Sequence, residues 1–162
     1  MAYDSNDPSK QYLRMKIESA TPIGLVVILY DGGIKFIKKA LVDMDNKSIM
    51  GFVDNVVKAQ NILRELRDSL DMSIDQIAPQ LRSLYTYMLK RLIVAAVEKT
   101  PEPAQEVLKM MESLRGTWDK VRSMAESGQI DVIKRDKSEV HQHSLKPNPI
   151  VHPQAPSISL QG

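Results

Sequence analysis

The 162-residue sequence contains no cysteine, and histidine is nearly as scarce, with three in the whole chain. Without thiols there is no disulfide, zinc–thiolate site, iron–sulfur cluster or cysteine nucleophile. All three histidines lie in the last 22 residues, so the rest of the chain lacks the side chain that most often carries protons at neutral pH. No Glu-x-x-His pair, which di-iron bundles require, is present. The sequence therefore predicts no enzyme, no cofactor and no metal site.

A strong excess of one charge is also missing, because 22 Lys and Arg face 20 Asp and Glu. Proteins that bind nucleic acid usually gather a basic excess on one face, so no nucleic-acid partner is expected. The longest stretch without charge, Ser19 to Tyr30, has 12 residues, fewer than the ~20 that span a bilayer. The first residues carry neither the basic nor the apolar region of a secretory signal. We expect no membrane insertion and a location in the cytosol, unless export follows a route that composition does not show.

The composition changes near Ser127. All eight aromatic residues lie at or before Trp118, whereas four of the nine prolines lie in the last 22 residues. Segments that are rich in proline and lack aromatics bury too little surface to offset chain ordering. We therefore expect an N-terminal segment over 1–20, a helical domain over 21–126 and a flexible tail over 127–162. The tail is either a solvated extension or carries a contact segment, Ser157–Leu160, for a groove or an export partner.

Apolar residues recur at helical spacing through the domain, and no alternating strand pattern is present. Thr21 with Pro22, and later Ser48, are typical of helix starts. The expected helices run from Thr21 to about Asp43, from Ser48 through Leu70, from about Ile77 to Lys99, and from Pro103 to about Glu126. Because the loops between them are short, neighbouring helices should run antiparallel. The predicted fold is all-α, an up-down four-helix bundle.

A helix in a bundle buries one apolar stripe, here called its seam, against its neighbours. The first and third of these helices carry more apolar residues than one such seam contains. On the first helix the seam is joined by a second stripe, with two glycines between the stripes; the second stripe is Leu25, Leu29, Phe36 and Ala40. On the third helix the additional apolar residues are Tyr87, Ile93, Val94 and Val97. Either these helices contact several neighbours within the bundle, or the extra residues form a partner site, as large exposed apolar patches usually do.

Three segments of the chain resemble motifs of one protein family. They are Tyr12–Leu41, which contains Ala-Thr-Pro and then Leu-Tyr-Asp-Gly-Gly-Ile; Leu84–Leu92, which reads Leu-Tyr-Thr-Tyr-Met-Leu-Lys-Arg-Leu; and Leu114–Trp118, which reads Leu-Arg-Gly-Thr-Trp. In this order the segments are similar to the FliS family, the cytosolic flagellin export chaperones. The resemblance covers residues 12–126. Departures occur at Ser9, where the family often has an aromatic residue, at Gly33 and Lys90, and in the long tail.

The resemblance implies a chaperone that binds the disordered C-terminal segment of flagellin in apolar grooves. Binding would prevent premature polymerisation in the cytosol and aid delivery to the flagellar type III export gate. The segment around Tyr12 is expected to lie over the groove as a lid when flagellin is absent. The expected partner contacts are Tyr12, Ile17, Tyr30, Ile34, Tyr87, Arg91 and Val94.

Two other interpretations stay open at this point. In the first, the chain is a structural bundle whose extra stripes close a homodimer. In the second, it is an enzyme with a ligand or cofactor in the bundle core, although the seams contain almost no convergent polar groups. The sequence leaves undecided which flagellin is bound and whether a co-chaperone docks elsewhere.

Overall fold

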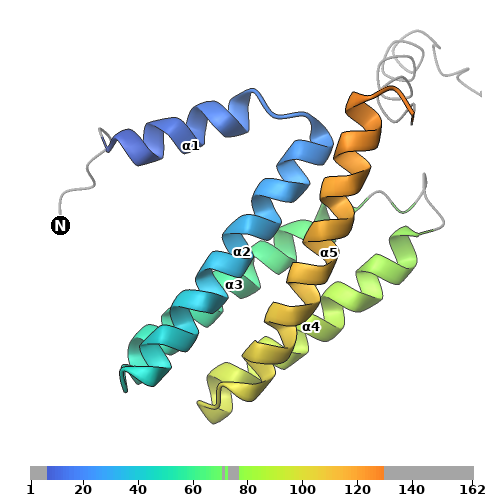
Figure 1. Ribbon diagram of the computed structural model, residues 1–162. Helices are drawn as coiled ribbons and strands as arrows, with labels where there is room; N and C mark the ends of the chain where they lie inside the picture. The colour runs from blue at the N-terminus through green and yellow to red at the C-terminus, as the bar shows by residue number, and fades with distance from the viewer. Residues whose placement is uncertain (1–6, 71, 73–76, 130–162) are drawn as a thin grey trace, which may run out of the picture.

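The computed structural model describes residues 7–70, 72 and 77–129, and within them all regular structure is helical (Figure 1). The five helices are α1 Pro8–Glu18, α2 Pro22–Asp45, α3 Ile49–Asp68, α4 Ala78–Glu98 and α5 Glu102–Glu126. The all-α prediction is confirmed. The part of the predicted tail from residue 130 onward lies outside the described residues.

Local sequence signals explain where the helices start and stop. Thr21 caps α2 by accepting a hydrogen bond from the Gly24 amide at 3.1 Å, and Ser48 caps α3 by accepting one from the Gly51 amide at 3.3 Å. α4 ends at Lys99, whose backbone adopts the left-handed conformation at φ 55°. The Thr21 and Ser48 side chains satisfy amide groups that the first turn of a helix leaves without partners. The four helices predicted from sequence are therefore confirmed, with ends that differ by one or two residues.

Helices α2 to α5 surround one hydrophobic core. α2 packs against α3 and α5, and α4 also packs against α3 and α5, so each helix has two neighbours. Successive helices reverse direction along the chain (Figure 1). Each helix contributes fully buried side chains; examples are Tyr30 and Ile37, Phe52 and Leu63, Met88 and Leu92, and Val107 and Met111. The apolar residues that recur at helical spacing along each helix thus supply the side chains that fill this core.

The N-terminal segment differs from its expected arrangement. It forms a helix, α1, which Asp7 caps by accepting a hydrogen bond from the Ser9 amide at 3.0 Å. None of the residues of α1 is buried, and α1 runs away from the start of α2 rather than along the other helices (Figure 1). The structure therefore does not show the expected lid. Pro8 and the Asp7 cap favour helix locally, and this local preference needs no contact with the core.

The paired glycines of α2 mark a close approach inside the molecule. Gly33 is buried, and a Cβ atom at this position would lie 2.6 Å from Met111 Cε and 3.2 Å from Ile62 Cγ2. The lack of a side chain thus lets α2 pack closely against α3 and α5. These contacts are within the chain, so Gly33 gives no support to a partner surface.

Two other glycines allow a matched test of helix stability. A Cβ atom at Gly116 would have no neighbour within 4 Å, whereas one at Gly51 would lie 2.8 Å from both Asp43 Oδ2 and Ser48 Oγ. Gly116→Ala should raise the free energy of unfolding by about 0.5–1 kcal/mol, because Ala favours helix over Gly. Gly51→Ala should not raise the free energy of unfolding in this way, because the added Cβ atom disturbs the Ser48 cap of α3. Urea unfolding measures both, and greater stabilisation by Gly51→Ala than by Gly116→Ala would contradict this packing.

Candidate functional site

An apolar hollow lies where α2 and α4 begin and α3 ends. We call it the end cavity; it has a volume of about 250 Å³ and is lined by Pro22, Ile23, Val26, Leu66, Ser69, Leu70, Ala78, Leu81, Tyr85 and Trp118. The Ser69 hydroxyl already donates to the Leu66 carbonyl oxygen at 3.1 Å. The lining thus consists mainly of apolar side chains contributed by four helices. Such a surface can take up apolar side chains but has no arrangement of groups for catalysis.

Two buried tyrosines form a pair at the end cavity: Tyr85 belongs to its lining, and Tyr30 is hydrogen-bonded to Tyr85. The hydroxyl groups of Tyr30 and Tyr85 lie 2.7 Å apart, and the two side chains are essentially inaccessible to solvent. Burial, as the largest cause, raises the pKa of both phenols. Tyr30 was expected to contact a partner, but the structure places it in the core. Its position in the α2 seam explains this, because the seam faces the other helices.

The outer face of α4 carries three of the predicted contacts, and we call Tyr87, Arg91 and Val94 the α4 face. Tyr87 is 44% exposed, and its hydroxyl donates to one carboxylate oxygen of Glu106 on α5. Arg91 Nε donates to the other oxygen at 2.7 Å. The Tyr87 hydrogen bond, followed by that of Arg91, lowers the pKa of Glu106, and the same bond raises the pKa of Tyr87. The polar ends of Tyr87 and Arg91 are thus fixed while the aromatic ring stays accessible.

The other predicted contacts do not join this face. Tyr12 and Ile17 lie on α1 and are 70% and 43% exposed. Ile34 is half-buried against the core. The second stripe of α2 is also partly used inside the molecule, since Phe36 is half-buried and Lys58 Nζ on α3 lies 5.8 Å from its ring centre. Only Tyr87, Arg91 and Val94 therefore form one local surface.

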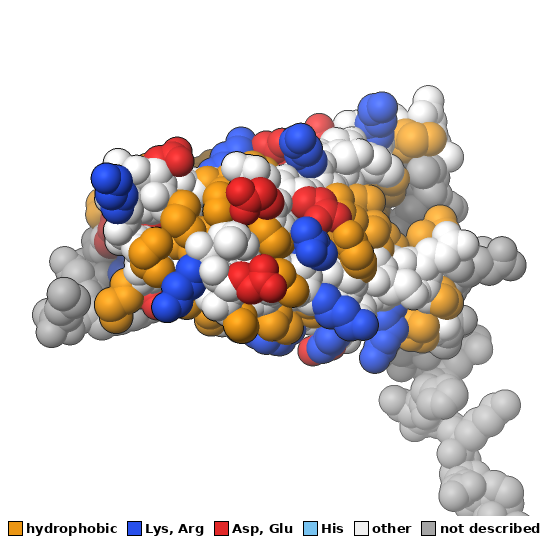
Figure 2. All heavy atoms as spheres, turned by 90° about the horizontal axis from the view of Figure 1, so that it is seen from below, with side chains coloured by type: hydrophobic (Ala, Val, Ile, Leu, Met, Phe, Trp, Pro, Cys, Tyr) orange, Lys and Arg blue, Asp and Glu red, His pale blue; other side chains and the backbone are white. Residues whose placement is uncertain are grey.

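The apolar surface is discontinuous on the face drawn in Figure 2. Hydrophobic side chains reach this surface in several clusters, and Lys, Arg, Asp and Glu side chains separate them. Among the described residues, the most exposed large hydrophobic side chains include Met50, Val97, Tyr12 and Met15. A bound segment would thus have to alternate between apolar and charged contacts along this face.

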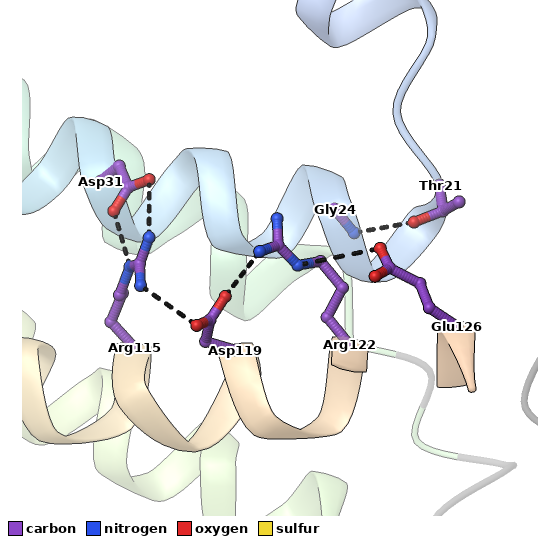
Figure 3. Close-up of polar contacts among 7 residues, drawn as sticks. All are labelled: Thr21, Gly24, Asp31, Arg115, Asp119, Arg122 and Glu126. Atoms are coloured by element: carbon purple, nitrogen blue, oxygen red, sulfur yellow. Dashed lines mark hydrogen bonds and ion pairs between the residues drawn. The ribbon is translucent and has the colours of Figure 1, made fainter. Parts of the chain in front are cut away.

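A ladder of ion pairs runs along the second half of α5, and its first member, Arg115, joins α5 to Asp31 of α2 (Figure 3). Arg115 Nε lies 2.8 Å from Asp31 Oδ1, and Arg122 Nη2 lies 2.7 Å from Asp119 Oδ1. The hydrogen bond from Arg115 to Asp31, as the largest cause, raises the pKa of Arg115. The ladder borders a second, more polar hollow, which lies beside the end of α1. The Arg115–Asp31 pair links α5 to α2 three residues before Trp118, which lies in the wall of the end cavity.

Sequence reasoning missed the end cavity. Leu70, Leu81 and Trp118 continue the core seams, and a heptad pattern gives no sign of where a seam stops being covered. Among the residues that the structure describes, no group of three or more potential metal ligands lies together. None of the helices in this part of the chain is long and apolar enough to cross a membrane.

The sequence model of the family described as "Flagellar protein FliS" matches residues 5–125. The chain belongs to the FliS family. It is 30% identical to the flagellar secretion chaperone FliS of Bacillus subtilis over 112 residues, which cover 69% of this chain and 84% of that protein. It is also 30% identical to FliS of Escherichia coli over 116 residues (68% and 85%) and to FliSB of Pseudomonas aeruginosa over 115 residues (68% and 91%).

The FliS assignment confirms the resemblance that the three sequence segments indicated. FliS proteins are flagellar secretion chaperones and not enzymes, in agreement with the prediction from the sequence. The family match includes α1 and nearly all of α5, and it ends at residue 125. The tail therefore lies beyond the part of the chain that the FliS match explains.

Proposed function

We propose that this FliS-family protein binds the disordered C-terminal segment of flagellin, prevents its premature polymerisation in the cytosol and aids its delivery to the flagellar export gate. In this proposal α2–α5 act as an up-down bundle that carries the binding surface. The observation that carries the proposal is the α4 face, where the Tyr87 ring is 44% exposed while its hydroxyl and Arg91 are held by Glu106. Aromatic residues and arginine are enriched in protein interfaces.

The physical basis is folding coupled to binding. A disordered client loses conformational entropy when it becomes ordered on the bundle, and this ordering typically costs 2–5 kcal/mol of the gross interaction energy. Burial of apolar side chains of the client against α4 offsets that cost. The same burial removes the side chains through which the client would associate with further copies of itself. Moderate net affinity then leaves release at the export gate feasible.

Tyr87→Ala tests the α4 face. Tyrosine is among the residues that most often dominate interfaces, so we expect the affinity for a flagellin C-terminal peptide to fall tenfold or more, which corresponds to ~1.4 kcal/mol. Thermal stability should change little because the ring lies outside the core. Titration calorimetry and thermal unfolding of the full chain measure the two effects.

Two variants serve as controls for Tyr87→Ala. Met50→Ala removes an equally apolar side chain that is 80% exposed on α3, and it should leave the affinity unchanged. Tyr87→Phe removes only the hydroxyl that bonds to Glu106, so it should retain most of the affinity if the ring makes the contact. Unchanged affinity together with a large drop in melting temperature for Tyr87→Ala would mean that the side chain is structural.

A further inference from the structure

The side of α3 that faces α4 follows from the contacts of α3 with α2. Asn55 donates a hydrogen bond to Asp43 of α2 at 2.7 Å, and Lys58 Nζ lies 5.8 Å from the ring centre of Phe36. These positions lie on one side of the buried stripe of α3, and α4 packs on the other side of that stripe. Residues on the α4 side recur at every third or fourth position; they are Val53, Val57, Gln60 and Arg64.

The side of α4 that faces α3 is identified in the same way. Tyr87 and Arg91 both donate to Glu106, so their side of α4 faces α5. The side across the buried stripe faces α3, and it carries Thr86, Lys90, Ile93 and Val97. We call these four residues and the four of α3 the α3–α4 face. None of them is Asp or Glu.

The α3–α4 face divides into an apolar half and a basic half. Leu66 of α3 and Tyr85 of α4 both line the end cavity, so they lie close to one level of two helices that run in opposite directions (Figure 1). Counted away from the cavity, Val57 and Ile93 then share a level as well. By the same count the apolar half consists of Val53, Val57, Ile93 and Val97, and the basic half of Gln60, Arg64, Thr86 and Lys90.

The apolar half is open to solvent. Val57 is 41% exposed, Ile93 is 45% exposed and Val97 is 74% exposed. Burial of these side chains against a partner would be favourable, because it removes apolar surface from water. Aliphatic side chains that two neighbouring helices expose side by side are typical of a partner site.

The basic half carries two cations that have no carboxylate partner among the described residues. Arg64 donates from Nη1 to Asn61 Oδ1 at 2.8 Å and from Nη2 to Gln60 Oε1 at 3.2 Å. Both oxygens belong to neutral amides, so they orient the guanidinium without cancelling its charge. No ion pair within the described residues includes Arg64 or Lys90. These two cations repel each other, and a carboxylate supplied from outside would relieve the repulsion.

We propose that the α3–α4 face binds an acidic and apolar segment of a second protein, whose apolar side chains cover the apolar half and whose Asp or Glu side chains pair with Arg64 and Lys90. Charge complementarity selects this occupant, because the face offers cations and no acid. A nucleic acid would contact the cations through phosphate and leave the apolar half uncovered. A second copy related by two-fold symmetry would bring the same face, again without a carboxylate, onto this one.

This second partner is distinct from the flagellin client. Tyr87 and Arg91 lie on the α5 side of α4, whereas Ile93 and Val97 lie on its α3 side. α4 thus separates two binding surfaces, and a chaperone that holds its client still presents the α3–α4 face. The inference therefore does not rest on the proposed function.

Fluorescence anisotropy with a synthetic peptide tests the basic half. The probe is a fluorescein-labelled peptide of about 12 residues, as long as the α3–α4 face, with Leu in one half and Glu in the other, made in both chain directions. We expect saturable binding to the full chain, and Arg64→Glu/Lys90→Glu should weaken it about tenfold or more. Lys35→Glu/Lys39→Glu makes the same charge change at two exposed lysines of α2 and should change the affinity by less than about twofold. Absence of saturable binding, or equal weakening by both double variants, would overturn the proposal.

A matched pair of valines tests the apolar half. Val97→Ser should weaken binding of the probe about fivefold, whereas Val42→Ser, the same change at a valine of α2 that is 56% exposed, should not. Thermal unfolding should be the same for all of these variants, since every substituted side chain is exposed. Equal effects of the two valine changes would overturn the proposal. Displacement of the probe by the C-terminal segment of flagellin, or tighter binding of phosphatidylserine vesicles through Arg64 and Lys90, would overturn the assignment to a second protein.

Discussion

Tyr30→Phe is expected to lower the free energy of unfolding by about 1–3 kcal/mol, a large effect for the loss of one oxygen atom. The hydroxyl of Tyr30 lies 2.7 Å from that of Tyr85, and both are shielded from solvent. Removal of one hydroxyl leaves the other buried without this partner. Urea unfolding of the single variant measures the cost.

The double variant separates the hydrogen bond from the burial of the rings. Tyr30→Phe/Tyr85→Phe removes both polar groups while both aromatic rings remain, so it should cost less than the sum of the single variants. We expect a coupling energy of about 0.5–3 kcal/mol from the double-mutant cycle, as for residues in direct contact. Additive single effects would show that the two hydroxyls do not depend on each other.

The second large effect is a loss of stability at alkaline pH. Burial raises the pKa of Tyr30 and Tyr85 above that of a free tyrosine, which is about 10. Below pH 10 both folded and unfolded tyrosines are protonated, so stability does not depend on these groups. Above it the unfolded chain releases these protons while the folded chain retains them, and stability falls by about 1.4 kcal/mol per pH unit for each of the two tyrosines that is still protonated in the folded chain.

Urea unfolding at a series of pH values from 9 to 11.5 tests this linkage. Lysines also titrate in this range, so the comparison that matters is with Tyr30→Phe/Tyr85→Phe. The double variant should show a distinctly shallower decline, because it retains the lysines and lacks the two buried phenols. The same slope in both proteins would mean that the tyrosines do not determine alkaline stability.

The sequence predicted the parts of the fold that depend on local interactions. The starts of α2 and α3 followed from Thr21 and Ser48, because a cap needs only the next three residues of the same chain. The core positions followed from the spacing of apolar residues, which is set by the helix repeat. The family followed from three motifs that the FliS match then covered.

The predictions that were wrong or incomplete depended on tertiary structure. Tyr30 and Tyr87 are both aromatic residues on helices with surplus apolar positions, yet one is fully buried and the other is 44% exposed. Spacing along one helix gives the relative angle between side chains but not which neighbour covers them. The direction of α1 and the end cavity depend likewise on how complete helices are placed at one end of the molecule.

The most direct test of the account is a calorimetric titration of the unmodified full chain with the C-terminal segment of flagellin from the same organism, followed by hydrogen exchange of the complex. We expect saturable 1:1 binding with a negative heat-capacity change, the signature of apolar burial, and slower exchange along the exposed side of α4 around Tyr87. An absence of binding heat at several temperatures, or a complex in which α4 exchanges as it does in the free protein, would contradict the proposed function.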